Sequence, residues 1–167
     1  MGNAKTDKES LTAELKKKSS LVEALGLSTK DVNGIAALAA ALYQEDRIES
    51  AVRILHGLTC LQPERAEFWS ALGGVLTRME KYEQAIPVLT VAVHLNPKDA
   101  AALVNRGECY IALADNEKSA ADLRKAIELD PQEKDPAGNR ARQLAYGMHT
   151  FFEECQKEEL DSVEVED

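Results

Sequence analysis

The sequence predicts an all-α protein built from consecutive pairs of helices. Hydrophobic residues make up 44% of the 167 residues but aromatic residues only 5%, so alanine and leucine must supply most of the packing between close helices. A chain of this size in strands normally carries more β-branched and aromatic residues. Prolines recur every 34 residues, at Pro63, Pro97 and Pro131, and a helix–turn–helix unit fits this period.

Three units in one register account for most of the chain. Aligned on the prolines they span 32–65, 66–99 and 100–133, without an insertion. Small side chains at two positions of each unit predict a close approach of its two helices. The eighth position of the three units holds Ala39, Gly73 and Gly107, and the twentieth holds Ala51, Ala85 and Ser119. Each proline is expected to end the second helix of its unit.

The middle unit carries the pattern most fully. Trp69 is followed by Leu72-Gly73, and Tyr82 is followed by Ala85 and, at the end of the unit, by Pro97. This arrangement resembles the tetratricopeptide repeat, and the resemblance extends over 32–133. It implies three such repeats in a helix-turn-helix solenoid.

A long amphipathic helix is expected after the last repeat, over 137–160. Its apolar residues recur at steps of three and four, and a solenoid needs a helix to cover its last apolar face. The apolar positions are Ala141, Leu144, Ala145, Met148, Phe151, Phe152 and Cys155. We expect a capping helix, with a docking face for a partner as the alternative, and an acidic tail over 161–167.

The N-terminal region is expected to contain two segments. Residues 1–18 are rich in lysine and predict a mobile segment, and leucines in 19–31 predict a short helical segment. Ser28-Thr29-Lys30-Asp31 has the residue types of a helix N-cap. Residues 1–6 also fit the N-myristoylation pattern, but six residues match such a pattern easily by chance.

Charge and cysteine content exclude several classes of protein. The net charge is −9, and residues 153–167 carry eight acidic residues against one lysine, which argues against binding to nucleic acid. Three widely separated cysteines without CxxC spacing suit reduced thiols in the cytoplasm. The longest apolar run, Ile35 to Tyr43, is far shorter than the roughly 20 residues that span a bilayer. We therefore expect a cytoplasmic protein without stable membrane insertion.

No pattern in the sequence indicates catalysis, a metal or a cofactor. His56, His94 and His149 fall in different elements, and none has the spacing of a two-histidine metal site. Gly73-Gly74 lies within a predicted helix and is therefore no phosphate-binding loop. A Ser-His-Asp or Cys-His site can form from residues distant in sequence, so this alternative stays open. The prediction is a protein that is not an enzyme and has no cofactor.

A solenoid of this kind presents a concave groove lined by the first helix of each unit. The positions that line it predict a groove that is mostly small and apolar, and therefore suited to an extended peptide. The residues expected to contact the peptide are Ala36, Ala40, Tyr43, Gln44, Ser70, Gly74, Thr77, Arg78, Val104, Glu108 and Ile111.

One known role of such repeats is excluded by these positions. Co-chaperones of the Hsp70 and Hsp90 type hold a C-terminal carboxylate with lysine and asparagine side chains. The residues of this carboxylate clamp are absent here. A carboxylate bound among apolar side chains would be an unpaired charge. The matching places hold Ala36, Ala40, Ala71, Ala101 and Asn105.

Residues 20–130 resemble a narrower group, the class II chaperones of bacterial type III secretion. A leucine-containing segment at 20–28 precedes GIAALAAALYQEDRIESA, and Leu58-Thr59-Cys60-Leu61-Gln62-Pro63 follows it. Phe68-Trp69 and Glu108-Cys109 also match the family. Two positions that are aromatic in the family are Ala36 and Ala40 here, which puts the usual anchor residues of the client in doubt.

The resemblance implies a chaperone that masks an extended segment of a hydrophobic translocator, similar to a PxLxxP-type motif. It also implies a homodimer contact through the N-terminal helix. The alternative is a generic adaptor that binds a soluble partner. The two differ in what the helix at 137–160 does, because an adaptor could bind through it, whereas a groove binder needs it mainly for stability.

Overall fold

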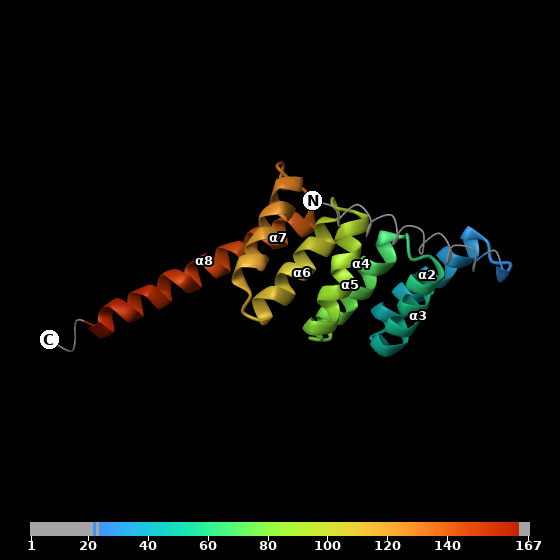
Figure 1. Cartoon of the computed structure of the whole chain (residues 1–167), viewed down its shortest axis with the longest axis horizontal. Coiled ribbons are helices and arrows are strands. Elements are labelled where there is room, and N and C mark those ends of the chain that lie inside the picture. Colours follow the sequence, from blue (N-terminus) through green and yellow to red (C-terminus); the bar gives the residue numbers. More distant parts are fainter. Residues whose placement is uncertain (1–21, 23, 164–167) are drawn as a thin grey trace, which may run out of the picture.

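The computed structural model describes residue 22 and residues 24–163, and seven helices lie in this part of the chain. They carry the labels of Figure 1, and together with the turns between them they make up an all-α fold. The helices are α2 (Thr29–Gln44), α3 (Ile48–Leu61), α4 (Ala66–Arg78), α5 (Tyr82–Leu95), α6 (Ala100–Ala112), α7 (Asn116–Leu129) and α8 (Pro136–Val163).

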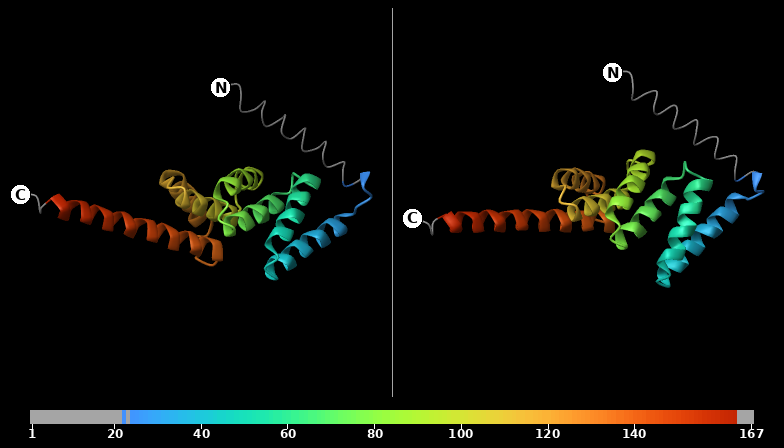
Figure 2. Two further views of the ribbon diagram at one scale, coloured as in Figure 1. Left: turned by 90° about the horizontal axis from the view of Figure 1, so that it is seen from below. Right: turned by 60° about the horizontal axis from the view of Figure 1, so that its bottom comes forward.

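The helices form three successive pairs that stack along the long axis of the molecule, followed by α8 (Figures 1 and 2). Within the pairs α2 packs on α3, α4 on α5 and α6 on α7. The first helix of a pair also contacts the preceding pair, since α6 packs on both α4 and α5. In the same way α8 packs on both α6 and α7. It thus takes the place that the first helix of a fourth unit would take.

The ends of the helices follow from the residues that were singled out in the sequence. The Ser28 hydroxyl accepts a hydrogen bond from the backbone N–H of Asp31, and the Asp31 carboxylate accepts one from the backbone N–H of Ser28. This capping box confirms the predicted N-cap. The second helices α3, α5 and α7 each end two residues before a proline of the 34-residue series, as expected.

The turn inside each pair repeats a backbone conformation. Asp46, Glu80 and Ala114 all have φ close to +60° (60°, 58° and 58°), and they stand at the same position of the three units. The left-handed conformation costs a residue with a Cβ roughly 1 kcal/mol. Each unit therefore reverses its chain in the same way, even though none has glycine at this position.

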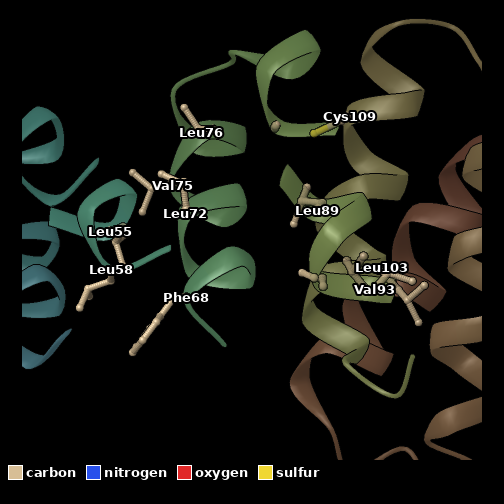
Figure 3. Close-up of a cluster of buried hydrophobic side chains, with 14 of the residues drawn as sticks. Leu55, Leu58, Phe68, Leu72, Val75, Leu76, Leu89, Val93, Leu103 and Cys109 are labelled. Carbon is tan, nitrogen blue, oxygen red and sulfur yellow. The ribbon is translucent and has the colours of Figure 1, made fainter. Parts of the chain in front are cut away.

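Small residues bring the two helices of a pair together, as the repeat predicts. A Cβ placed on Gly73 would lie 2.4 Å from Leu89 of α5, and one on Gly107 would lie 3.1 Å from Leu123 of α7. Figure 3 shows the packing between pairs, where Leu55 of α3 faces the α4 side chains. The core is thus a continuous layer between helices.

A buried ion pair joins the two helices of the last pair, and its arginine also reaches the pair before it. The guanidinium of Arg106 on α6 donates to both carboxylate oxygens of Asp122 on α7, at 2.7 Å each, and to the hydroxyl of Thr90 on α5 at 3.1 Å. The two charged side chains are only 15% and 9% exposed. The hydrogen bond to Asp122 raises the pKa of Arg106 further above its usual value.

A second carboxylate orders the joint between α7 and α8. Asp130 accepts hydrogen bonds from the backbone N–H groups of Lys134 and Asp135 and from the guanidinium of Arg142. Burial acts to raise the pKa of Asp130, but these donors outweigh it and hold that pKa below its usual value. Asp130 therefore joins the end of α7 to the turn before α8 and to Arg142 of α8.

The long C-terminal helix differs in extent from the prediction. α8 runs from Pro136 to Val163, so the tail expected over 161–167 begins inside the helix. Ala141 is fully buried, whereas Phe151 is 62% exposed, because the C-terminal part of α8 extends beyond the stack (Figure 1). The mobile segment 1–18 and the pattern at residues 1–6 rest on residues outside the described part. The homodimer contact through the helical segment at 19–31, of which residue 22 and residues 24–31 are described, stays a prediction.

Candidate functional site

A concave groove runs across the first helices of the stack. Its volume is about 1120 Å³, and α2, α4, α6 and the start of α8 provide most of its wall. Nine of the residues named from the repeat positions lie on this wall. They are Ala36, Ala40, Tyr43, Gln44, Ser70, Gly74, Thr77, Arg78 and Glu108.

Two residues named with them do not lie on the wall of this groove. Val104 is only 1% exposed, because the first turn of α8 packs beside it, where Ala137 and Arg140 line a small adjoining hollow. Ile111 is half-buried against the hydrophobic core. Both pack against neighbouring helices. From the third repeat, Glu108 and Asn105 lie on the groove wall.

The floor of the groove is made of short side chains. All five positions that correspond to a carboxylate clamp lie on its wall, and four of them carry only a methyl group. They are Ala36, Ala40, Ala71, Ala101 and Asn105. Gly74 adds a position without any side chain. These six positions, which we call the floor of the groove, therefore carry no charge.

Three arginines on the wall are already paired within the protein. Arg78 donates to Asp46 at 3.1 Å and stacks on Tyr43, at 4.7 Å from the ring centroid. Arg65 pairs with Glu67 and donates to Asn33 at 2.9 Å. The third, Arg140 of α8, pairs with Glu108 of α6. Each arginine thus has a partner on a neighbouring helix or turn.

Arg140 of α8 also lies on the groove wall, although it was not among the residues expected there, and its side chain is half exposed. A signal was present in the spacing, because Asn33–Arg65, Asp46–Arg78 and Glu108–Arg140 each lie 32 residues apart. Polar partners at this spacing meet across adjacent first helices.

The buried Cys109 thiol lies next to the groove, in contact with the wall residue Thr77. Burial raises the pKa of the Cys109 thiol, and the hydrogen bond with Thr77 lowers it only in part, so this thiol stays protonated. The Thr77 hydroxyl lies 3.2 Å from the Cys109 sulfur and donates to the carbonyl of Gly73. Within residues 24–163 no group of three or more histidine, cysteine, aspartate or glutamate residues could hold a metal ion.

A helix that crosses a membrane needs about 20 mostly apolar residues. Across the described part of the chain, no helix combines the necessary length with the necessary hydropathy.

Comparison with known families finds the same type of repeat in this chain. Residues 75–134 match the family model of the tetratricopeptide repeat. This part of the chain consists of tetratricopeptide repeats. The matched part begins inside α4 and extends through α7 to the turn before α8, so it covers the third unit and most of the second.

Curated relatives share the repeat over a part of their length. Over 90 residues the chain is 34% identical to Hsp70-Hsp90 organizing protein 1 of Glycine max. The matched stretch covers 54% of this chain and 16% of that protein. Over 97 residues it is 32% identical to the UDP-N-acetylglucosamine–peptide N-acetylglucosaminyltransferase of Giardia intestinalis, at 58% of this chain and 7% of the transferase. The chain thus spans only a small part of these relatives, one of which is named as an enzyme.

Among solved structures, the chain is similar to a secretion chaperone over almost the whole length of that chaperone. The structure is that of the Yersinia enterocolitica type III secretion chaperone SycD in complex with a peptide of the translocator YopD. The TM-score is 0.63 at 20% identity, and the similarity covers 79% of this chain and 97% of SycD. At this identity the likeness concerns the fold.

Proposed function

We propose that this tetratricopeptide-repeat protein is a non-enzymatic, cytoplasmic chaperone. It holds an extended, apolar segment of a translocator-type client in the concave groove. The groove masks the segment from water and so keeps a client with long apolar stretches soluble. The fold shared with SycD, which was solved with a translocator peptide, supports this choice of client.

The observation that carries the proposal is the uncharged floor of the groove. Four alanines occupy the clamp positions, and the arginines of the wall are paired with residues of the protein itself. A carboxylate bound there would lose its hydration without gaining a free cation, at a cost of several kcal/mol. A side chain of apolar atoms loses nothing comparable and gains about 25 cal/mol for each Å² that it buries.

This chemistry separates the chain from the Hsp70-Hsp90 organizing protein to which it is similar in sequence. Co-chaperones of the Hsp70 and Hsp90 type are expected to hold a carboxylate with lysine and asparagine side chains. Here Asn105 is the one polar side chain among the five corresponding residues. The sequence similarity therefore supports a repeat scaffold, and the groove supports a different ligand.

A substitution that fills the groove tests the proposal. The side chain of Gly74→Arg would enter the groove from α4, whereas the space around Gly57 on α3 is open, with nothing within 4 Å of an added Cβ. Gly57→Arg therefore adds the same charge outside the groove and serves as the matched control. Both variants should keep the helical circular dichroism of the original protein.

The two variants are compared in an affinity capture from native lysate under reducing conditions, with mass spectrometry of the captured proteins. The proposal expects a protein with long apolar segments that is captured by the original chain and by Gly57→Arg but not by folded Gly74→Arg. Equal capture by Gly74→Arg would refute the assignment of the groove.

A second candidate is an adaptor that binds a soluble partner through α8. Tyr146 and Phe151 support it, since these aromatic side chains are 71% and 62% exposed on α8. Replacing both by serine should abolish capture by an adaptor of this kind. A chaperone that uses the groove should capture its client unchanged, because neither residue lies on the groove wall.

A further inference from the structure

The groove is deepest in the space between α2 and α4. α6 packs on α4 and α8 packs on α6, whereas α2 and α4 approach each other less closely. The groove therefore reaches Leu55 of α3, which is 6% exposed. Leu89 and Leu123 stand at the same position of the other two units, are at most 1% exposed and do not line the groove. The first unit is thus open to a depth at which the other two units are closed.

The size of the side chains at two equivalent junctions explains this difference. Between α4 and α6, the Asn105 side chain fills the space beside Gly74, since a Cβ on Gly74 would lie 3.0 Å from its nitrogen. Between α2 and α4, the same two repeat positions are occupied by Ala40 and Ala71. Both alanines are exposed on the groove wall, and their methyl groups leave the middle of this junction open.

Two arginines connect α2 and α4 at the ends of this opening. Arg65, directly before α4, donates to Asn33 of α2 at 2.9 Å and lies 4.3 Å from the centroid of the Phe68 ring. Arg78, the last residue of α4, stacks on the ring of Tyr43 of α2. Tyr43 follows Asn33 by ten positions in α2, so the opening is about 15 Å long. We call the opening between Arg65 and Arg78 the window.

The bottom of the window is apolar. Phe68 and Val75 of α4 line the groove together with Leu55 of α3, and all three side chains are almost completely buried. In Figure 3 they point into the space between α3 and α4. A side chain that enters the window is therefore surrounded by apolar atoms, and the burial of its own apolar area stabilises the complex.

The two arginines favour an aromatic side chain over an aliphatic one. A guanidinium group attracts the face of an aromatic ring, and Arg65 and Arg78 each lie over a ring of the protein already. A ring in the window can add to either stack, and it can also pack edge to face on Phe68. A leucine side chain makes neither of these interactions.

We infer that the window between α2 and α4 is an anchor site for one aromatic side chain of the bound segment, and that this site selects the client. The inference rests on the proposed function. Ala36 and Ala40, where the family that the sequence resembles carries aromatic residues, both lie on the groove wall. The window is therefore a feature of this chain, and a segment without an aromatic anchor leaves its bottom uncovered.

The test uses a capped nonapeptide with the pattern Pro-x-Leu-x-x-Pro, its other positions alanine or serine, and a second peptide in which phenylalanine replaces the leucine. Both carry a fluorophore and are titrated into the full chain by fluorescence anisotropy. The phenylalanine peptide should bind about fivefold more tightly, as expected for one added aromatic or cation–π interaction.

Two leucine variants examine where this preference arises. Ala40→Leu fills the window from an exposed position of α2, so it should remove the preference for phenylalanine. Ala121→Leu makes the same change at an exposed position of α7 outside the groove, and it should keep both the affinity and the preference.

The methyl resonances of three leucines show where the ring binds in the original protein. An aromatic ring shifts the NMR resonances of methyl groups next to it, so the phenylalanine peptide should shift those of Leu55 more than the leucine peptide does. Leu89 and Leu123, at the same repeat position of the closed units, should change little with either peptide. This measurement does not depend on the folding of a variant.

The outcomes separate the inference from the function on which it rests. The inference is wrong, and the proposed function stands, if both peptides bind with equal affinity or if folded Ala40→Leu keeps the preference. The same holds if the Leu55 methyl resonances do not respond to the ring. If neither peptide binds at about 1 mM, the assigned ligand class is wrong, and the inference falls with it.

Discussion

The two sides of the first helices differ in how closely they are filled, and adjacent residues show this directly. On α4, Gly73 faces Leu89, which would lie 2.4 Å from an added Cβ, whereas Gly74 faces the groove. On α6, Arg106 makes a buried ion pair with Asp122, whereas the amide of its neighbour Asn105 lies on the groove wall without a partner among the described residues. The side with Gly73 and Arg106 is filled by contacts within the fold, whereas the side with Gly74 and Asn105 is open to the groove.

This difference teaches which residues can vary without loss of the fold. The packing side depends on small residues and on one paired charge, so a change there affects stability first. The groove side has few internal contacts, so a change there should affect binding first. Two substitution experiments test this separation and a third tests the joint before α8, from the largest expected effect to the smallest.

The ion pair on the packing side should give the largest effect on stability. Asp122→Ala leaves the largely buried guanidinium of Arg106 without its carboxylate. We expect the free energy of unfolding to fall by about 3 kcal/mol, measured by urea denaturation. The double variant Asp122→Leu/Arg106→Met, which removes both charges, should be more stable than Asp122→Ala. A loss below about 0.5 kcal/mol for Asp122→Ala would contradict the role of the pair.

The two glycines of α4 should respond to alanine with opposite signs. Gly73→Ala forces a methyl group against Leu89, and overpacking of this kind costs about 1–3 kcal/mol. Gly74→Ala meets only the movable Asn105 side chain, so the helix should gain about 0.5–1 kcal/mol. Thermal unfolding of both variants checks this. Destabilisation of equal size in both would show that the groove side is packed as tightly as the other.

The Asp130 carboxylate at the joint before α8 should make the free energy of unfolding depend on pH in the acidic range. The pKa of Asp130 is held below its usual value in the folded protein. Its contribution is therefore present above the pKa of about 3.9 in the unfolded chain and is lost as pH falls through the lower folded value. Asp130→Asn should unfold with a shallower dependence on pH between about pH 4 and 2, measured by urea midpoints. An unchanged slope would contradict the role of this carboxylate.

The fold could be predicted from the sequence because the same residue types recur at the same positions of three units, so each unit supports the assignment of the others. The prolines two residues after α3, α5 and α7 and the small residues at Gly73 and Gly107 predict both the helices and their pairing. Most of the groove follows from the same register, since a repeat position determines the side of the helix on which a residue lies.

The rest could not be predicted because it depends on α8, which lies outside the repeats. The repeat position of Val104 predicted a side chain in the groove, but the first turn of α8 packs beside this residue. The pairing of Arg140 with Glu108 depends on the contact between α8 and α6, which the repeat pattern does not describe. Whether the Asn105 amide has a hydrogen-bond partner depends on the side chains around it in the folded protein, and a single sequence does not contain that information.

The central claim is that ligands bind on the groove side of the first helices. The most direct measurement is a titration of isotope-labelled protein with the capped Pro-x-Leu-x-x-Pro nonapeptide, followed by amide chemical shifts in NMR spectra. The account predicts that the largest shift changes occur at Ala40, Ala71, Gly74 and Asn105, with small changes at Gly57 and Gln84. Shift changes concentrated on α3, α5 and α7, or on α8 after residue 146, would contradict it.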